Sequence, residues 1–172
     1  MFLTLRSRAV LTIIAVVCGW CFALTASAAD PVPAPSLILP SDHGQVDLAA
    51  LKGRVVYLDF WASWCGPCRK SFPWMSDLQA RYASQGLSVI AVNLDQDHAQ
   101  VAKFLAAYPP GFTVAYDPQG TSAEHYDVQG MPSSYLIDRA GRIRARHIGF
   151  REQDAAAREE EVRKLLLSET GR

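Results

Sequence analysis

The sequence predicts one α/β domain in which helices flank a mixed central sheet. Two stretches, 54–61 and 87–94, are almost continuously apolar, as strands buried on both faces are. A stretch with helical spacing of apolar residues follows each of them, and the chain closes with a hairpin and a last helix. At 172 residues and 49% hydrophobic content, the chain is long enough for one domain with a sizeable core.

The first residues differ from the rest. Arg6 and Arg8 precede an uncharged stretch, 9–29, which contains the small residues typical of a signal peptidase site. We therefore expect residues 1–28 to be a signal peptide that is cleaved before Ala29. An uncleaved membrane anchor is the alternative, since about 20 uncharged residues can span a bilayer. Both alternatives predict an exported, periplasmic protein.

The folded part is expected to begin after a proline-rich linker, 29–35. Segments 36–39 and 45–48 flank a turn cluster, 40–44, and predict an N-terminal hairpin. The stretch 54–61 then predicts a central parallel strand.

Helices and strands alternate next. Pro67 begins a helical stretch that Gly86 is placed to end, and 87–94 predicts the second buried strand. A helix over 97–108 and a short strand over 112–116 follow.

A short helix over 122–126 and a strand pair, 134–138 and 142–149, complete the predicted sheet. The last element is a helix with an apolar inner face and ion pairs on its outer face. The inner residues are Val162, Leu165 and Leu166, and the outer pairs are Glu159/Arg163 and Glu160/Lys164. The domain would thus span 36–168, with a tail at 169–172.

Charge and cysteine usage exclude several functions. Seventeen basic and seventeen acidic residues cancel, so the electrostatic footprint of a nucleic-acid binder is missing.

Cys18 and Cys21 lie within the leader, which leaves Cys65 and Cys68 in the mature chain. The loop between these two is too short for a disulfide to stabilise much. The four histidines have no zinc-ligand spacing, and Arg69 stands where c-type haem attachment needs histidine. No cofactor is expected.

The motif Cys65-Gly66-Pro67-Cys68 therefore predicts redox chemistry. It joins the end of a buried strand to the start of a helix, where free N–H groups and the helix dipole stabilise an anion. Because the thiolate is the reactive form of cysteine, Cys65 is the expected nucleophile. Cys68 lies one turn into the helix and is the expected resolving thiol, less exposed than Cys65.

Asp59 stands in an otherwise apolar strand. Burying a carboxylate is costly, so such a residue is protonated, hydrated or functional.

These features resemble the thioredoxins, and more closely their exported TlpA-like/ResA-like branch. The resemblance covers about residues 36–168. Its motifs are the strand and Cys-x-x-Cys run from Tyr57 to Lys70, Pro73 in the helix, 89–95 and 130–138. The chain between Cys68 and Met131 is longer than in a plain thioredoxin by about one helix and one strand, the insertion of that branch.

The resemblance implies further site residues. It implies a cis peptide bond at Pro132, against the disulfide, with the backbone of Met131 free to pair with substrate. Trp64, Gly66 and Pro67 would surround the disulfide and contact substrate. It also implies that Asp59 accepts the proton of Cys68, although a water-bridged structural role stays open.

This sequence also departs from the family pattern. Ala91 stands where thioredoxin has the lysine near this aspartate, and Ser71 stands where ResA-like proteins often have glutamate.

The expected function is an exported thiol-disulfide oxidoreductase that reduces protein disulfides. Its partners would be oxidised exported proteins and a membrane thiol-reductant carrier of the DsbD type, with the protein itself a monomer. The alternative is a copper-delivery protein for respiratory enzyme assembly, because thiolates suit Cu(I). Met75 and His147 would be its further ligands, but no sequence relation brings either to the cysteines.

Overall fold

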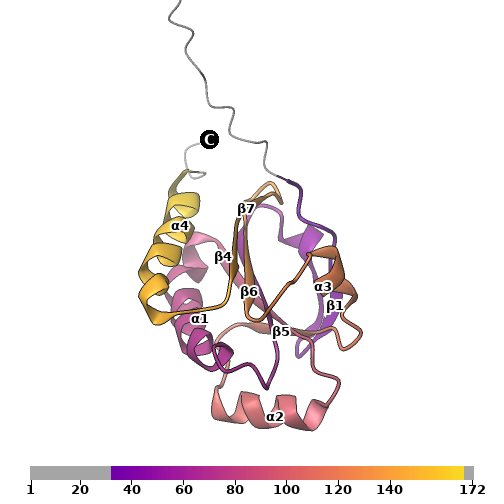
Figure 1. The fold of residues 1–172 in the computed structure, drawn as a ribbon. Helices are drawn as coiled ribbons and strands as arrows, with labels where there is room; N and C mark the ends of the chain where they lie inside the picture. The colour runs from indigo at the N-terminus through magenta and orange to yellow at the C-terminus, as the bar shows by residue number, and fades with distance from the viewer. Residues whose placement is uncertain (1–31, 169–172) are drawn as a thin grey trace, which may run out of the picture. The chain divides into compact units, whose positions relative to one another are not determined.

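The structure, a computed structural model, describes residues 32–168 (Figure 1). Strands and helices alternate through the middle of this part of the chain. The strands are β1 (Ile38–Ser41), β2 (Gly44–Asp47), β3 (Val55–Trp61), β4 (Leu87–Asn93), β5 (Thr113–Tyr116), β6 (Ser133–Ile137) and β7 (Ile143–Ile148). The α-helices are α1 (Cys68–Tyr82), α2 (His98–Ala107), α3 (Thr121–His125) and α4 (Ala155–Ser168). Short 3₁₀ helices are η1 (Leu48–Leu51), η2 (Ala83–Gln85) and η3 (Glu152–Asp154).

The strands form one mixed sheet, in the order β2-β1-β5-β4-β3-β6-β7. β3, β4 and β5 are parallel, because α1 and α2 carry the chain back between them. β6 and β7 add antiparallel strands on one side, and the β1–β2 hairpin adds two on the other. The predicted mixed sheet, the N-terminal hairpin and the helix-strand insertion formed by α2 and β5 are confirmed.

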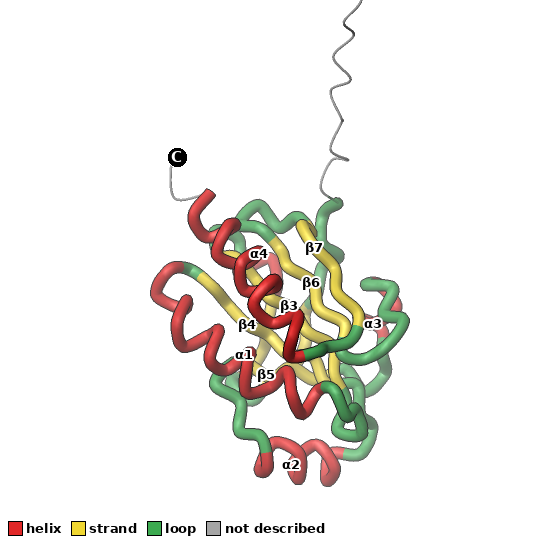
Figure 2. Tube along the Cα trace, turned by 60° about the vertical axis from the view of Figure 1, so that its left-hand side comes forward, coloured by secondary structure: helices red, strands yellow, loops and turns green. Residues whose placement is uncertain are grey.

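Each face of the sheet carries its own apolar core. Val55, Tyr57 and Trp61 of β3 pack with residues of α1, α2 and α4 on one face. The alternate residues of β3, such as Leu58 and Phe60, pack with the N-terminal hairpin and the α3 region on the other. Figure 2 shows α1 and α4 side by side in front of the strands. This two-sided burial explains why β3 is fully buried along its length.

Helix α1 begins where the sequence places it. Pro67 is its N-cap residue and has helical dihedral angles, in keeping with the fixed φ of proline at helix starts. Pro73 lies inside the helix, which nevertheless continues to Tyr82. A 3₁₀ turn and Gly86, with a φ of 98°, then close the segment, since glycine adopts the left-handed conformation without steric cost.

The N-terminal hairpin has a tighter turn than the predicted cluster 40–44. Pro40 and Ser41 belong to β1, and Ser41 pairs directly with Gly44. Ser41 is also in register with Ala115 of β5. The turn itself consists of Asp42 and His43, so the predicted turn boundaries, 40–44, were wrong.

One predicted ion pair of the last helix is also wrong. Glu159 does not pair with Arg163; it accepts hydrogen bonds from Arg81 and from the Tyr82 hydroxyl at 2.7 Å, and so links α4 to α1. Arg163 pairs with Glu160 at 2.7 Å, and Lys164 also approaches Glu160, as expected. Glu159 lies on the side of α4 that meets α1, where a cross-helix partner is within reach.

Part of the predicted linker is paired with the domain. Pro33 forms a β-bridge with Arg142, and the backbone of Ala34 donates to Gly141. The predicted signal peptide, 1–28, and tail, 169–172, lie outside the described residues. Within 32–168, none of the helices combines the length and the apolar character needed to cross a bilayer.

Candidate active site

The two cysteines meet at the N-terminus of α1. They form a disulfide with an S–S distance of 2.08 Å, and their Cα atoms lie 5.3 Å apart. The Cys68 backbone N–H donates a hydrogen bond to the Cys65 sulfur at 3.3 Å. The first N–H groups of a helix have no intrahelical partner, so this one is available to stabilise negative charge on that sulfur.

The disulfide is covered more than the sequence suggested. Cys65 is 3% exposed and Cys68 0%. The order of exposure is the predicted one, but Cys65 does not stand out into solvent. Its neighbours Trp64, Gly66 and Pro67 are exposed, with Trp64 at 68%, so the surface available to a partner is formed by residues around the sulfur. Trp61, in contrast, is buried against Phe72 and Phe104.

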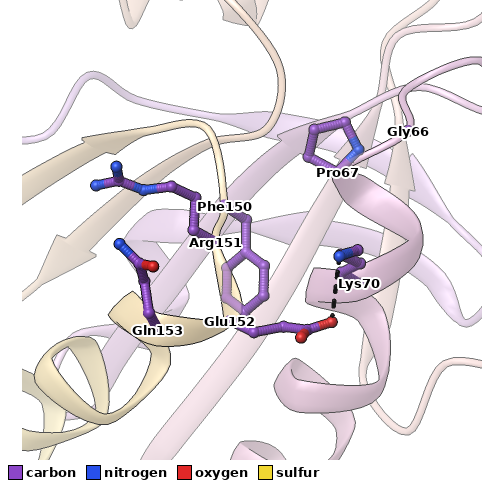
Figure 3. Close-up of a pocket in the computed structure, with 7 residues that line it drawn as sticks. All are labelled: Gly66, Pro67, Lys70, Phe150, Arg151, Glu152 and Gln153. Atoms are coloured by element: carbon purple, nitrogen blue, oxygen red, sulfur yellow. Dashed lines mark ion pairs between the residues drawn. The ribbon is translucent and has the colours of Figure 1, made fainter.

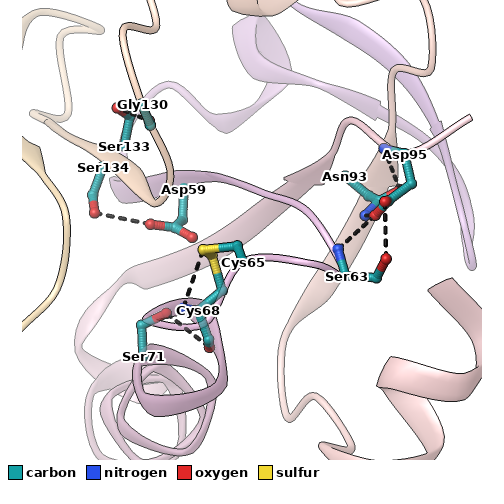
Figure 4. The surroundings of a disulfide bond; sticks show 10 residues. All are labelled: Asp59, Ser63, Cys65, Cys68, Ser71, Asn93, Asp95, Gly130, Ser133 and Ser134. Carbon is teal, nitrogen blue, oxygen red and sulfur yellow. Dashed lines mark hydrogen bonds between the residues drawn. A yellow bond between two sulfur atoms is a disulfide. The ribbon is translucent and has the colours of Figure 1, made fainter. Parts of the chain in front are cut away.

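A buried carboxylate holds the loop before the cysteines (Figure 4). Asp95 follows β4 and accepts hydrogen bonds from the backbone N–H and the hydroxyl of Ser63, at 2.7 and 2.9 Å. The amide of Asn93 donates to the same carboxylate at 2.7 Å. Because β3 and β4 are parallel, their carboxyl ends lie together, and Asp95 can fix the backbone two residues before Cys65.

Asp59 is buried behind the disulfide, 1% exposed. Figure 4 shows its carboxyl group pointing toward the two sulfur atoms. The Ser134 hydroxyl donates to one carboxyl oxygen at 2.9 Å, and the other oxygen is buried without a hydrogen-bond partner. Burial raises the pKa of Asp59 to about 7, against the opposing influence of Ser134 and Arg158.

Arg158 of α4 is a residue that the sequence reasoning missed. It is only 5% exposed and acts electrostatically on both Asp59 and Tyr57. Burial, followed by the Asp59 charge, raises the pKa of Tyr57 to about 12. A signal was available, because Arg158 lies one helical turn before the inward-facing Val162 and therefore on the same side of the helix.

The loop before β6 completes the site. The Met131–Pro132 peptide bond is cis. Pro132 is buried and Met131 is partly exposed. The Pro132 carbonyl accepts a hydrogen bond from the Gly149 N–H at 2.7 Å, and the Ser133 hydroxyl donates to the Gly130 carbonyl at 2.7 Å.

Two surface pockets flank the cysteine motif. One, of about 510 Å³, lies between Gly66, Pro67 and Lys70 of the α1 start and residues 150–153, where Lys70 and Glu152 form an ion pair at 3.4 Å (Figure 3). The other, of about 570 Å³, includes Trp64 in its lining. Its remaining lining residues are Ser63, Arg69, Leu94, Asp95, Gln96, Asp97 and Gln100.

Two residues were considered as further copper ligands, Met75 and His147. Met75 is buried in the core on α1, and the His147 ring is 2.7 Å from the Glu161 carboxylate. Within residues 32–168, no three or more His, Cys, Asp or Glu side chains are grouped so as to hold a metal ion.

Comparisons with known proteins agree with this site. The Redoxin family profile matches residues 27–166. The thiol-disulfide oxidoreductase ResA of Bacillus subtilis is 34% identical over 123 residues, which are 71% of this chain and 69% of that protein. A crystal structure of a candidate thiol:disulfide interchange protein DsbE from Chlorobium tepidum is 51% identical, with a TM-score of 0.77 over 79% of this chain and 96% of that one.

A solution structure of a candidate protein disulfide isomerase from Bacteroides thetaiotaomicron is 27% identical, with a TM-score of 0.73 over 80% of this chain and 89% of that one. The family match, the relative and the shared fold agree with a cysteine pair at disulfide distance. The chain therefore belongs to the Redoxin family and is a ResA-like thiol-disulfide oxidoreductase with a thioredoxin-like fold.

Proposed function

We propose that this oxidoreductase reduces disulfides in other exported proteins, with Cys65 as the attacking thiol and Cys68 as the resolving thiol. The observation that carries the assignment is the hydrogen bond from the Cys68 N–H to the Cys65 sulfur at the start of α1. That N–H favours negative charge on Cys65. Cys68, the first residue of α1, is fully buried, so a substrate reaches Cys65 first.

The reaction balances as two exchanges. The Cys65 thiolate attacks one sulfur of a substrate disulfide, and the other substrate sulfur leaves as a thiolate. Cys68 then loses its proton and attacks the Cys65 sulfur of the mixed disulfide. The Cys65–Cys68 bond forms, the second substrate thiolate leaves, and two electrons have passed to the substrate.

Asp59 is proposed to receive the Cys68 proton in the second exchange. Its side chain points toward the disulfide, and one carboxyl oxygen is free of hydrogen-bond partners. A pKa of about 7 suits proton transfer at neutral pH, because both forms of the carboxyl group are then populated.

Substrate contact is proposed for the exposed residues around the disulfide. Trp64, Gly66 and Pro67 are exposed, and Met131 is partly exposed. In this proposal the first three contact the substrate and the backbone of Met131 pairs with an extended peptide. The two pockets add concave surface on either side of the cysteine motif, where substrate side chains could bind.

Direction, donor and location complete the proposal. Gly66-Pro67 between the cysteines matches the reducing thioredoxins, whose potential is near −270 mV, and not strong oxidants near −120 mV. A reductant outside the cytoplasm must itself be reduced again after each cycle, and we propose a DsbD-type membrane carrier as its electron donor. We also propose that the protein is a monomer. The proposed organisation is a leader at 1–28, cleaved or retained as an anchor, a linker at 29–35 whose residues 33 and 34 pair with the domain, the domain at 36–168 and a tail at 169–172. Cell fractionation and the mass of the mature N-terminus test export and cleavage.

The thiol roles are tested by comparing Cys65→Ser and Cys68→Ser in insulin-disulfide reduction. All variants carry Cys18→Ser and Cys21→Ser, so that the leader thiols cannot contribute. We expect Cys65→Ser to abolish reduction. Cys68→Ser should accumulate a mixed disulfide with the substrate, because no second thiol can resolve it. Non-reducing gels and mass spectrometry detect the adduct.

The reverse pattern, with the adduct on Cys68 in the Cys65→Ser variant, would contradict the assignment of roles. Trapping of partners on Cys68→Ala in an extract of exported proteins would identify the physiological substrates.

A further inference from the structure

A buried positive charge and a buried negative charge lie on the same face of the sheet, and each has an atom without a hydrogen-bond partner. They are the second carboxyl oxygen of Asp59 and the Nη1 atom of Arg158. An isolated buried charge is costly, whereas opposite charges in a low-dielectric interior stabilise each other. The two groups come from β3 and α4, elements that pack together.

Arg158 is held firmly in place. Its Nη2 donates to the Gly149 carbonyl at 2.7 Å, and its guanidinium carbon lies 5.4 Å from the centre of the Phe150 ring. The N–H of the same Gly149 donates to the Pro132 carbonyl. Gly149 therefore connects the Arg158 guanidinium to the cis-proline loop by two hydrogen bonds.

Sheet register shows which groups can face Asp59. Ala91 of β4 and Ser134 of β6 are its direct neighbours, and His147 of β7 follows in the same row. Ala91 and Ser134 carry no charge, and His147 is engaged by Glu161. Tyr57 on β3 and Arg158 on α4 are the ionisable groups that interact electrostatically with Asp59. Among the described residues, Arg158 is the cation acting on Asp59.

We propose that Arg158 is the buried countercharge of Asp59 and a positioning residue for resolution of the mixed disulfide. It keeps the carboxylate form of Asp59 available to receive the Cys68 proton. Ala91, the neighbour of Asp59 on the adjacent strand, has no charge. Arg158 therefore supplies the positive charge that this position lacks. The kinetic part of the inference rests on the proposed role of Asp59, whereas the electrostatic part does not.

The test removes the charge of Arg158. Arg158→Gln keeps a polar amide but carries no charge, and Arg158→Lys is the matched control that keeps the charge. The carboxyl pKa of Asp59 is measured by ¹³C NMR on the oxidised full chain. We expect Gln to raise it by about 1 unit or more and Lys to change it much less, because a nearby opposite charge shifts a carboxyl pKa by about 1–3 units.

The kinetic readout follows the resolving step by stopped flow. We expect Arg158→Gln to slow this step at pH 7 by about tenfold, with the loss recovered at higher pH. In an Asp59→Asn background, Arg158→Gln should cause no further slowing. If only the kinetics fail while the Asp59 pKa moves, the assignment of Asp59 as proton acceptor is wrong and the countercharge stands.

Arg158→Met replaces Arg158→Gln should the latter not fold, with the same expected shift. In the parent protein, the Arg158 Nε–H resonance should also titrate with the Asp59 midpoint. The proposal would be overturned if the Asp59 pKa is unchanged in a folded variant without the charge, or if the Arg158 resonance does not follow the titration of Asp59. Arg158 would then have only a structural role, through its hydrogen bond to the Gly149 carbonyl.

Discussion

At the scale of a single residue, Asp59 combines two properties that rarely occur together. It is almost completely buried, and one of its carboxyl oxygens has no hydrogen-bond partner. Burial favours the protonated form, while Ser134 and Arg158 favour the charged form. Burial is the larger effect, so the pKa is about 7 and the group changes charge near neutral pH.

Asp59→Asn should therefore slow the resolving step at pH 7 and leave the attack by Cys65 nearly unchanged. The amide cannot take the Cys68 proton, whereas the Cys65 thiolate is stabilised by the helix start. General-base assistance contributes about 10²–10⁴-fold, which sets the upper range of the loss. Stopped-flow traces of the two steps at pH 7 and pH 9 measure it.

The loss should shrink at pH 9, because an unassisted thiol with a pKa near ~8.5 ionises there. Equal rates in variant and parent at pH 7 would give Asp59 a purely structural role.

Much of the candidate site could be predicted at this scale, but its electrostatics could not. Cys65, Cys68, Asp59 and Pro132 stand in recognisable local patterns, so their positions follow from the chain alone. Arg158 does not, because it stands in a highly charged helix segment that is typical of an exposed face. Its spacing from Val162 places it on the inner side of α4, but only the folded structure shows that it is buried and acts on Asp59. The low exposure of Cys65 is likewise visible only in the folded structure.

At the scale of an element, the loop between β3 and α1 depends on a side chain from the next parallel strand. Asp95 accepts three hydrogen bonds there, two from Ser63 and one from Asn93. Asp95→Ala should destabilise the protein by about 2–3 kcal/mol, because it leaves buried donors unpaired. We also expect slower insulin reduction, since the backbone two residues before Cys65 loses its anchor. Urea unfolding and the reduction rate measure the two effects.

Asp47→Ala is the matched control. Asp47 caps the 3₁₀ helix η1 by accepting from the Ala49 N–H at 2.8 Å, and it lines neither of the pockets beside the cysteines. Loss of such a cap costs about 1 kcal/mol and should leave the reduction rate unchanged. A similar rate loss in both variants would show that general destabilisation, and not the loop, is responsible.

The elements themselves were largely predictable, and their ends less so. Buried apolar runs locate β3 and β4 to within about one residue, because burial on both faces leaves a strong pattern. Helical spacing locates the start of α1 and the inner face of α4, but not where α1 ends or where α4 begins. The ends of the hairpin depend on strand pairing between Ser41 and Gly44, which no local pattern specifies. The link from Glu159 to Arg81 joins two helices far apart in the chain and is likewise a tertiary property.

At the scale of the whole molecule, the buried carboxyl group makes stability depend on pH. Its folded pKa is raised from 3.8 to about 7, so folding is favoured by proton binding, fully below pH 3.8. This contribution is lost as the pH rises toward about 7. Asp59→Asn removes the ionisation, so the oxidised variant should gain stability relative to the parent between pH 4 and pH 8.

The relative gain should reach roughly 4 kcal/mol at pH 8, the free-energy equivalent of the pKa shift. Urea unfolding of both oxidised proteins across this range measures it. A difference between the two proteins that stays constant from pH 4 to pH 8 would show that Asp59 titrates as it does in the unfolded chain.

The β-bridge at Pro33 determines at which end of the sheet the domain can be tethered. The bridge joins the incoming chain to Arg142, just before β7, and β7 runs in the same direction as β3. The incoming chain thus meets the sheet at the end where β3 starts, whereas the dithiol follows the end where β3 finishes. An attachment made before residue 32, to a bilayer, an affinity tag or an electrode surface, therefore joins the domain at the pole opposite the two sulfur atoms.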